Sequence, residues 1–141
     1  MPGAISRMDK IYLDSCLVIY LVERHPRFHG PLRARLAETA DATFCVSVLT
    51  RLEVLTRPLR EHDDPLVRRY ESFLGVQERL ALDDDIVNAA LNWRVSGLKT
   101  PDALHVALAK RYACTAFWTN DDRLAKAAPG WSENALKDVG P

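Results

Sequence analysis

The 141-residue chain has no pair of cysteines at the Cys-x-x-Cys spacing, and its three cysteines, Cys16, Cys45 and Cys114, lie far apart in apolar runs. This pattern predicts buried free thiols and argues against a disulfide framework, a zinc site or a catalytic cysteine. No apolar run approaches the roughly 18 residues that a transmembrane helix needs, so we expect no membrane partner. The N-terminus also lacks the apolar segment of a secretory signal, and the expected compartment is the cytoplasm.

The chain also lacks an excess of charge of either sign, because 19 Lys and Arg residues balance 19 Asp and Glu residues. A large basic field of the kind that attracts nucleic acid is therefore excluded. A nucleic-acid substrate would have to be held by local patches. The length fits a single domain spanning residues 1–141, of which residues 1–8 are expected to form a flexible N-terminal extension.

Short β-type runs alternate along the chain with segments of helical periodicity. This order predicts an α/β fold, a central parallel sheet of four to five strands covered by helices on both faces. The expected strands are "KIYLD", "TFCVS", "RLAL" and "TAFWT", with a weak fifth in the C-terminal "WSENALKDVGP".

Two helices carry finer predictions. In "VLTRLEVLTR", residues Leu52, Leu55 and Leu59 form an apolar stripe, and Pro58 is expected to end or kink the helix. In "KTPDALHVALAKR", Thr100 is the expected N-cap, Pro101 the first helical residue, and the apolar interior predicts a buried helix.

Four acids stand where the predicted elements would bring them to one edge of the sheet. Asp14 and Asp121 follow strands, Glu53 lies in the first turns of the helix after the second strand, and Asp102 begins the buried helix. Ligands in open parallel α/β sheets bind outside the carboxyl ends of the strands. Capping and the helix dipole alone explain an acid at a helix start, and we interpret the acids at 63–64 and 83–85 in that way. The convergence of four acids is what favours a site.

A cluster of carboxylates repels itself, by roughly 3 kcal/mol for two charges about 5 Å apart at an effective dielectric of 20. Such a cluster persists if a cation binds or if some acids are protonated. Oxygen ligands suit Mg²⁺ or Mn²⁺, which leave coordination positions for a phosphate and a water. The chemistry indicated is metal-assisted hydrolysis of a phosphodiester.

The segments "IYLDSCLVIYLVE", "VSVLTRLEVLTRP", "TPDALHVALA" and "FWTNDDRL" together resemble a PIN-domain ribonuclease of the VapC toxin type. The resemblance covers nearly the whole chain. It implies a three-layer α/β/α sandwich, hydrolysis of RNA by a metal-activated water, homodimerisation and inhibition by a cognate antitoxin. Carried over residue by residue, the metal-binding and catalytic acids are Asp14, Glu53, Asp102 and Asp121, with Asp122 as the alternative to Asp121.

Supporting roles follow for nearby side chains. Thr119 either orients the cluster through its hydroxyl or simply ends a strand, and Ser15 is interpreted as the first residue of its helix, with contact to Asp14 as the alternative. His105 lies one turn after Asp102, and we interpret it as a core histidine. Candidate phosphate contacts, which are equally explained as solvated side chains, are Arg51, Arg57, Lys99, Arg123 and Lys126. The three tryptophans, Trp93, Trp118 and Trp131, are predicted to pack in the interior rather than to stack on bases.

Three alternatives stay open at this point. A phosphoacceptor receiver domain would need paired acids after the first strand and a lysine ending a late strand. A haloacid-dehalogenase-like phosphatase would need Asp-x-Asp, but residue 16 is Cys. The third alternative is a PIN scaffold that binds its partner and cleaves nothing.

Overall fold

A computed structural model describes residues 9–139, and the predicted flexible extension at residues 1–8 lies outside the described residues. The sheet has five strands that are all parallel, in the order β3-β2-β1-β4-β5. The strands are β1 (Lys10–Leu13), β2 (Thr43–Ser47), β3 (Glu78–Leu80), β4 (Ala116–Thr119) and β5 (Ser132–Asn134). The predicted α/β fold with a parallel sheet is confirmed, and the weak fifth strand is present.

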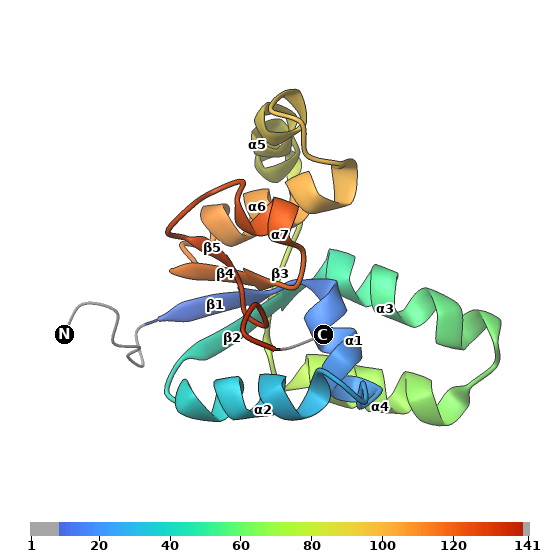
Figure 1. Cartoon of the computed structure of the whole chain (residues 1–141). Coiled ribbons are helices and arrows are strands. Elements are labelled where there is room, and N and C mark those ends of the chain that lie inside the picture. The colour runs from blue at the N-terminus through green and yellow to red at the C-terminus, as the bar shows by residue number, and fades with distance from the viewer. Residues whose placement is uncertain (1–8, 140–141) are drawn as a thin grey trace.

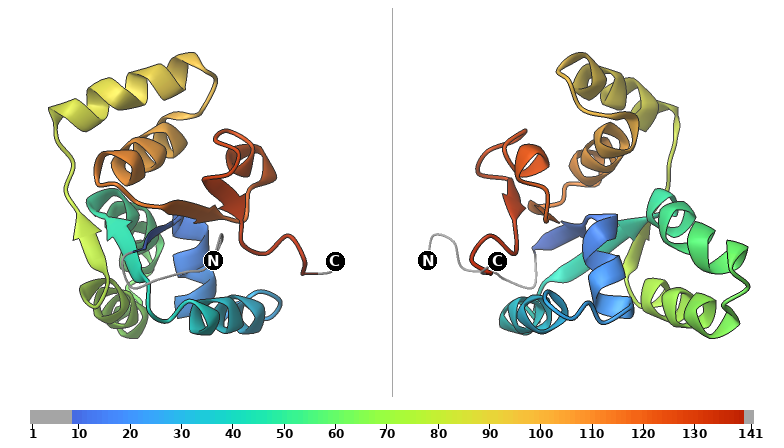
Figure 2. Two further views of the ribbon diagram at one scale, coloured as in Figure 1. Left: turned by 90° about the vertical axis from the view of Figure 1, so that its left-hand side faces the viewer. Right: turned by 45° about the vertical axis from the view of Figure 1, so that its right-hand side comes forward.

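Seven helices connect the strands in the part of the chain that is described. They are α1 (Ser15–Val22), α2 (His29–Glu38), α3 (Val48–Arg60), α4 (Asp64–Gly75), α5 (Asp84–Val95), α6 (Thr100–Arg111) and α7 (Asp122–Ala125). Helices α1 to α4 lie on one side of the sheet and α5 and α6 on the other, which gives the three layers seen in Figure 1 and Figure 2.

The three inner strands are buried on both faces over most of their length, as expected for a parallel sheet covered by helices. Along β1, Ile11 and Leu13 pack with α1 to α4, whereas Tyr12 between them faces α5 and α6. Strand β4 repeats this alternation, with Trp118 on the first face and Phe117 on the second. Because β1 is the central strand, its carboxyl end has a neighbouring strand end on each side.

Helix α3 corrects one prediction. Leu52 and Leu59 are 66% and 55% exposed, and the buried face is formed instead by Thr50, Val54, Leu55 and Pro58. Leu55 belongs both to the predicted stripe and to the buried face, and the other buried residues follow the neighbouring positions of the helix. The helix begins with a capping box formed by Ser47 and Thr50. Pro58 does not end the helix, which continues to Arg60.

Helix α6 is buried as predicted, but its start is shifted by one residue. Thr100 is already helical, and the N-cap is Lys99, which makes no side-chain capping bond. The interior residues Ala103 and His105 to Ala109 are all buried. The predicted caps at Asp63 and Asp83 are confirmed, since each side chain accepts a backbone N–H of its helix.

The cysteines and tryptophans behave largely as predicted. All three cysteines are free, with Cys45 and Cys114 buried and Cys16 half-buried. Trp118 is 1% exposed, and Trp93 and Trp131 are partly buried against the core on the other face of the sheet.

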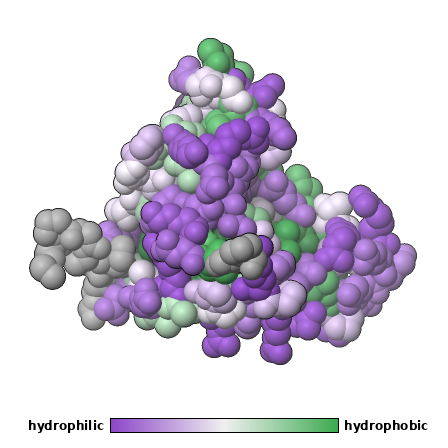
Figure 3. Space-filling view, viewed as in Figure 1, coloured by the Kyte–Doolittle hydropathy of each residue, from purple (hydrophilic) through white to green (hydrophobic). Residues whose placement is uncertain are grey.

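The surface seen in Figure 3 is mostly hydrophilic, with small apolar patches that include one over α5. No helix among residues 9–139 has both the length and the apolar character needed to cross a membrane.

Candidate metal and catalytic site

Asp14 stands directly after the central strand, and the fold holds both of its carboxylate oxygens. Its backbone N–H still bonds to Trp118 O of β4, at 2.9 Å, so the residue continues the sheet. Oδ1 accepts the N–H of Ser15 at 2.8 Å as the N-cap of α1. Oδ2 accepts the hydroxyl of Thr119 at 2.7 Å. The carboxylate is therefore fixed at the junction of β1, α1 and β4.

Thr119, the last residue of β4, is the link between two acids. Its Oγ1 donates to Asp14 and accepts the backbone N–H of Asp121 at 3.1 Å. Asp121 in turn caps α7, with Oδ1 accepting the N–H groups of Arg123 and Leu124 at 2.9 and 3.3 Å. The hydroxyl of Thr119 thus orients the strand ends, and the interpretation as a plain strand-end threonine is too simple.

Asp102 approaches the same edge from the first turn of α6. Burial raises the pKa of its carboxyl group, and the negative charges of Asp14 and Asp121 raise that pKa further. Asp102 therefore lies close enough to Asp14 and Asp121, which come from two other segments, for their charges to act on it.

Glu53 lies on α3, and one of its carboxylate oxygens contacts both Ser15 and His105. The Oγ of Ser15 donates to Glu53 Oε1 at 2.7 Å, and Nε2 of His105 lies 2.5 Å from the same atom. Burial raises the pKa of Glu53, but the bonds from His105 and Ser15 outweigh it, and the net pKa is lowered. Ser15 is thus both the first helical residue and a partner of Glu53, a role the sequence interpretation missed.

His105 is 1% exposed, so its interpretation as a core histidine is confirmed in part. Its bond to Glu53 was not part of that interpretation. Two further contacts were also missed: the hydroxyl of Tyr12 lies 2.5 Å from Nδ1 of His105, and the thiol of Cys16 donates to Asp14 Oδ2 at 3.8 Å. Burial and the charge of Asp14 raise the pKa of Cys16 to about 12, which keeps this thiol neutral. The sequence did hold one indication of these contacts: His105 is a polar residue in the otherwise apolar stretch that follows Asp102 in "DALHVALA".

Asp122 and two of the candidate arginines point elsewhere. Asp122 accepts the side-chain amide of Asn134 at 2.7 Å, which ties it to β5. Arg51 pairs with Glu71, and Arg57 with Glu23 and Glu61. Among the candidate phosphate contacts, Lys99 is exposed and precedes Asp102 by three residues, and the guanidinium of Arg123 lies 3.8 Å from Asp121 Oδ2.

The donor set suits a hard divalent cation in its chemistry. Asp14, Asp102, Asp121 and Glu53 supply carboxylate oxygens, the ligand type that Mg²⁺ and Mn²⁺ prefer. Within residues 9–139, no three His, Cys, Asp or Glu side chains already lie close enough to form a ready-made metal site. The fit therefore rests on the ligand type and on the negative charge that Asp102 shares with Asp14 and Asp121.

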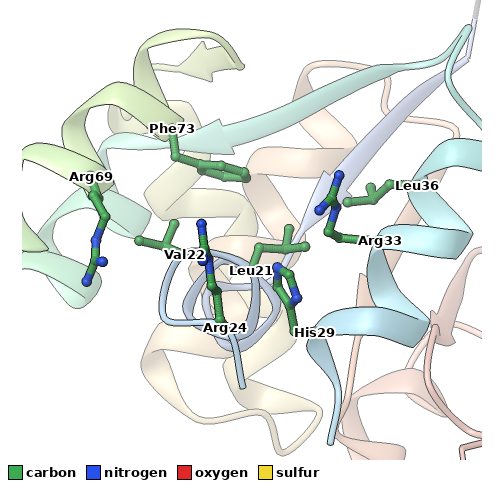
Figure 4. A pocket seen from close by; sticks show the side chains of 8 residues that line it. All are labelled: Leu21, Val22, Arg24, His29, Arg33, Leu36, Arg69 and Phe73. Carbon is green, nitrogen blue, oxygen red and sulfur yellow. The ribbon is translucent and has the colours of Figure 1, made fainter. Parts of the chain in front are cut away.

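A separate groove lies between the C-terminal end of α1, α2 and α4. It encloses about 370 Å³. Figure 4 shows apolar side chains from all three helices with basic side chains among them. The lining residues are Leu21, Val22, Arg24, His29, Arg33, Leu36, Arg69 and Phe73.

The five-stranded parallel sheet with acids at its carboxyl edge places the chain among the open α/β proteins, which bind their ligands outside that edge. The chain belongs to the PIN domain family, because residues 11–129 match the model of that family. This membership argues against the receiver and phosphatase alternatives. No curated protein sequence matches the chain.

Solved structures share the fold at low sequence identity. VapBC2 from Rickettsia felis, bound to a DNA fragment from its promoter, is 15% identical with a TM-score of 0.75, over 89% of this chain and 98% of that one. DNA-bound VapBC from Salmonella typhimurium is 19% identical with a TM-score of 0.73, covering 91% and 99%. VapC20 from Mycobacterium tuberculosis, a toxin that cleaves the Sarcin-Ricin loop, is 17% identical with a TM-score of 0.70, covering 84% and 95%.

Proposed function

We propose that this PIN domain is a ribonuclease that depends on Mg²⁺ or Mn²⁺ and acts as the toxin of a toxin–antitoxin pair in the cytoplasm. The observation that carries the proposal is the hydroxyl of Thr119, which bonds both Asp14 and the backbone of Asp121 and so brings these acids together at the carboxyl edge of the sheet. Asp102 lies close enough that their charges, added to its burial, raise the pKa of its carboxyl group. The solved structures with a similar fold include a toxin that cleaves the Sarcin-Ricin loop, which supports RNA as the substrate class.

The acids Asp14, Asp102 and Asp121 would hold the metal, with Glu53 beside them. When bound, the ion supplies Lewis-acid polarisation of the phosphate and activation of a water. The protein residues do the positioning: Thr119 fixes Asp14 relative to Asp121, and Ser15 fixes Glu53. Arg123 and Lys99, both exposed beside acids of the site, are the proposed contacts to RNA phosphates.

The proposal is tested by incubating the purified chain with RNA and Mn²⁺. Asp14→Asn and Asp102→Asn should each lower the cleavage rate by more than about 100-fold, since residues that only orient metal ligands already cost roughly 10–100-fold. Asp41→Asn is the matched control, because Asp41 is an exposed acid in the turn before β2. Equal residual cleavage by wild type and all variants would instead identify a binding module without nuclease activity.

The groove between α1, α2 and α4 is the proposed seat of the antitoxin. Similar folds have been solved as VapBC complexes and as FitAB bound to DNA. An apolar floor with Arg24, Arg33 and Arg69 around it fits an amphipathic segment with acidic residues beside its apolar face. None of these three arginines pairs with a carboxylate among the described residues. Changing Arg33 and Arg69 together to Glu should weaken capture of the antitoxin encoded beside this chain without reducing cleavage of RNA.

Homodimerisation is proposed to use the outer face of α5. Val87, Leu91 and Val95 lie four residues apart on this helix and are 44%, 56% and 88% exposed. An uncharged apolar stripe can meet its own copy across a twofold axis, whereas the basic groove would repel itself. Light scattering should give the mass of a dimer for the wild type and of a monomer for Leu91→Lys; a monomeric wild type would refute this assignment.

A further inference from the structure

A buried row of hydrogen bonds runs from the middle of the sheet to Glu53. It begins at Tyr12 of β1, whose hydroxyl contacts Ser47 Oγ at 2.8 Å and Nδ1 of His105 at 2.5 Å. It continues from Nε2 of His105 to Glu53 Oε1 at 2.5 Å. Tyr12 and His105 are 0% and 1% exposed, so the row is withdrawn from solvent up to its last member.

Both ring nitrogens of His105 are used, which fixes the orientation of the imidazole in its plane. Tyr12 is fixed as well, because its ring stacks on Phe117 with 5.3 Å between centroids. The surrounding side chains on this face of the sheet are almost all apolar. Buried polar groups that are fully bonded inside such a core hold a defined geometry, since any other arrangement leaves a group unsatisfied.

The row ends on one particular atom of Glu53. Oε1 receives both His105 and Ser15, whereas Oε2 receives no hydrogen bond from the residues that the structure describes. Glu53 projects from α3 with its side chain 32% exposed. The two contacts at Oε1 thus fix the orientation of this partly exposed carboxylate, and with it the position of Oε2.

We propose that His105, held by Tyr12, is a positioning residue that sets the place of the Glu53 carboxylate relative to Asp14 and Asp102. This inference rests on the proposed metal-dependent function. The side chain of His105 bonds to Tyr12, Ser15 and Glu53, and Glu53 is the one proposed metal ligand among these partners. The known pattern in metal sites is that partners orienting a ligand change metal affinity or activity by roughly 10–100-fold when removed.

Two variants test the row at different points, and both use the full chain. His105→Leu removes the bond to Glu53 while keeping an apolar side chain in an apolar core. Tyr12→Phe removes a single hydroxyl and leaves the ring stack on Phe117 in place. The Mn²⁺ dissociation constant is measured by calorimetry, alongside kcat and KM for a model RNA and the melting temperature.

We expect His105→Leu to weaken Mn²⁺ binding by about tenfold or more and to lower kcat more than it changes KM. Tyr12→Phe should act in the same direction and more weakly. Because Tyr12 acts through His105, the double variant should match His105→Leu alone, which is the non-additivity expected of linked residues. His105→Gln, whose amide can replace Nε2 as the donor to Glu53, should recover part of the affinity.

Tyr70→Phe is the matched control. Tyr70 is a fully buried tyrosine that donates to the carboxylate of Glu23 on the other face of the sheet. Its loss should lower the melting temperature as Tyr12→Phe does, without changing Mn²⁺ affinity or kcat. A purely structural role for the row would make Tyr12→Phe and Tyr70→Phe alike in all readouts, and would overturn the inference.

The failure of this inference and that of the proposed function are distinguishable. If Asp14→Asn changes neither Mn²⁺ binding nor cleavage, the metal-dependent function is wrong and the inference falls with it. If Asp14→Asn removes both while Tyr12→Phe and His105→Leu equal the wild type, only the positioning role is wrong. Should His105→Leu fail to fold, Tyr12→Phe against Tyr70→Phe decides the question.

Discussion

The hydroxyl of Thr119 lies 2.7 Å from Asp14 Oδ2, although the two residues are 105 positions apart in the chain. The hydroxyl oxygen of Thr119 also accepts the backbone N–H of Asp121, so this one side chain aligns the acids that follow β1 and β4. Thr119 is fully buried, which means that no water competes for these bonds at the threonine. The buried side chain of Thr119 therefore links the two proposed ligands, Asp14 and Asp121, by hydrogen bonds.

Thr119→Val keeps the shape of this side chain and removes its hydroxyl. We expect a loss of kcat of roughly 10–100-fold, because Asp14 then loses its orienting donor. A loss of about 1–3 kcal/mol in the free energy of unfolding should accompany it, since the N–H of Asp121 is left without its acceptor. Single-turnover cleavage and urea unfolding measure the two effects. Thr119→Ser should retain most of the activity, and a Ser variant as poor as Val would contradict the explanation.

The two neighbouring acids should separate cleanly by mutation. Asp121→Asn should abolish metal-dependent cleavage, because Asp121 shares the field of Asp102. Asp122→Asn should leave most of the activity, since Asp122 is bonded to Asn134 of β5. Parallel cleavage assays at saturating Mn²⁺ are sufficient. A larger loss in Asp122→Asn than in Asp121→Asn would reverse the assignment of the fourth acid.

The raised pKa of Asp102 has a consequence for stability in metal-free protein. Burial and the charges of Asp14 and Asp121 make the folded protein hold this proton more tightly than the unfolded chain does. The contribution of the protonated Asp102 to the stability of the fold is therefore fully present below the unfolded pKa of about 3.8. This contribution is lost as the pH rises through the pKa of the folded state. At pH 7, Asp102→Asn should raise the melting temperature in the presence of EDTA.

Asp41→Asn serves as the control for this measurement, because Asp41 is exposed and precedes β2, at the edge of the sheet opposite to the acids of the site. The gain from Asp102→Asn should shrink as the pH is lowered below 4, where the wild-type carboxyl is also neutral. A melting temperature that falls at pH 7 in Asp102→Asn would show that the charged group stabilises the fold.

Added Mn²⁺ should raise the melting temperature of the wild type. An ion that binds only the folded chain stabilises it by about 2.7 kcal/mol at 100 times its dissociation constant. Asp14→Asn should respond much less at the same concentration. Differential scanning fluorimetry with Ca²⁺ and K⁺ at equal ionic strength separates specific binding from general screening. Equal shifts in wild type and Asp14→Asn would place the ion elsewhere.

The sequence predicted the elements because each carries a strong local pattern. A strand followed by an acid and a helix, as at Asp14, leaves little choice of structure, and the alternation of such units requires a parallel sheet. The buried stripe of α3 was not predictable in the same way, since Leu52 and Leu55 both belong to the predicted stripe and only Leu55 is buried. The choice depends on tertiary packing, in which Val54 and Leu55 join the core on this face of the sheet.

Within the site, the sequence predicted which acids lie along the sheet edge, but it did not predict which side chains form hydrogen bonds with them. Asp14 and Asp102 were identifiable because each stands at the end of a clear element. The bond of Ser15 to Glu53 joins α1 to α3, and that of His105 to Glu53 joins α6 to α3. Such bonds depend on interhelical distances of a few ångströms, which no residue spacing records. The same limit applies to Arg51 and Arg57, whose partners Glu71 and Glu23 come from other helices.

The order of the strands, β3-β2-β1-β4-β5, also bears on when the site can exist during synthesis. Asp14 is synthesised early, whereas its neighbour Thr119 is added 105 residues later and the acid at 121 follows it. Until β4 inserts beside β1, the first acid has no partner strand on that side. A chain that stops before residue 116 therefore lacks β4 and the acid at 121 that follows it, and its acid edge is incomplete.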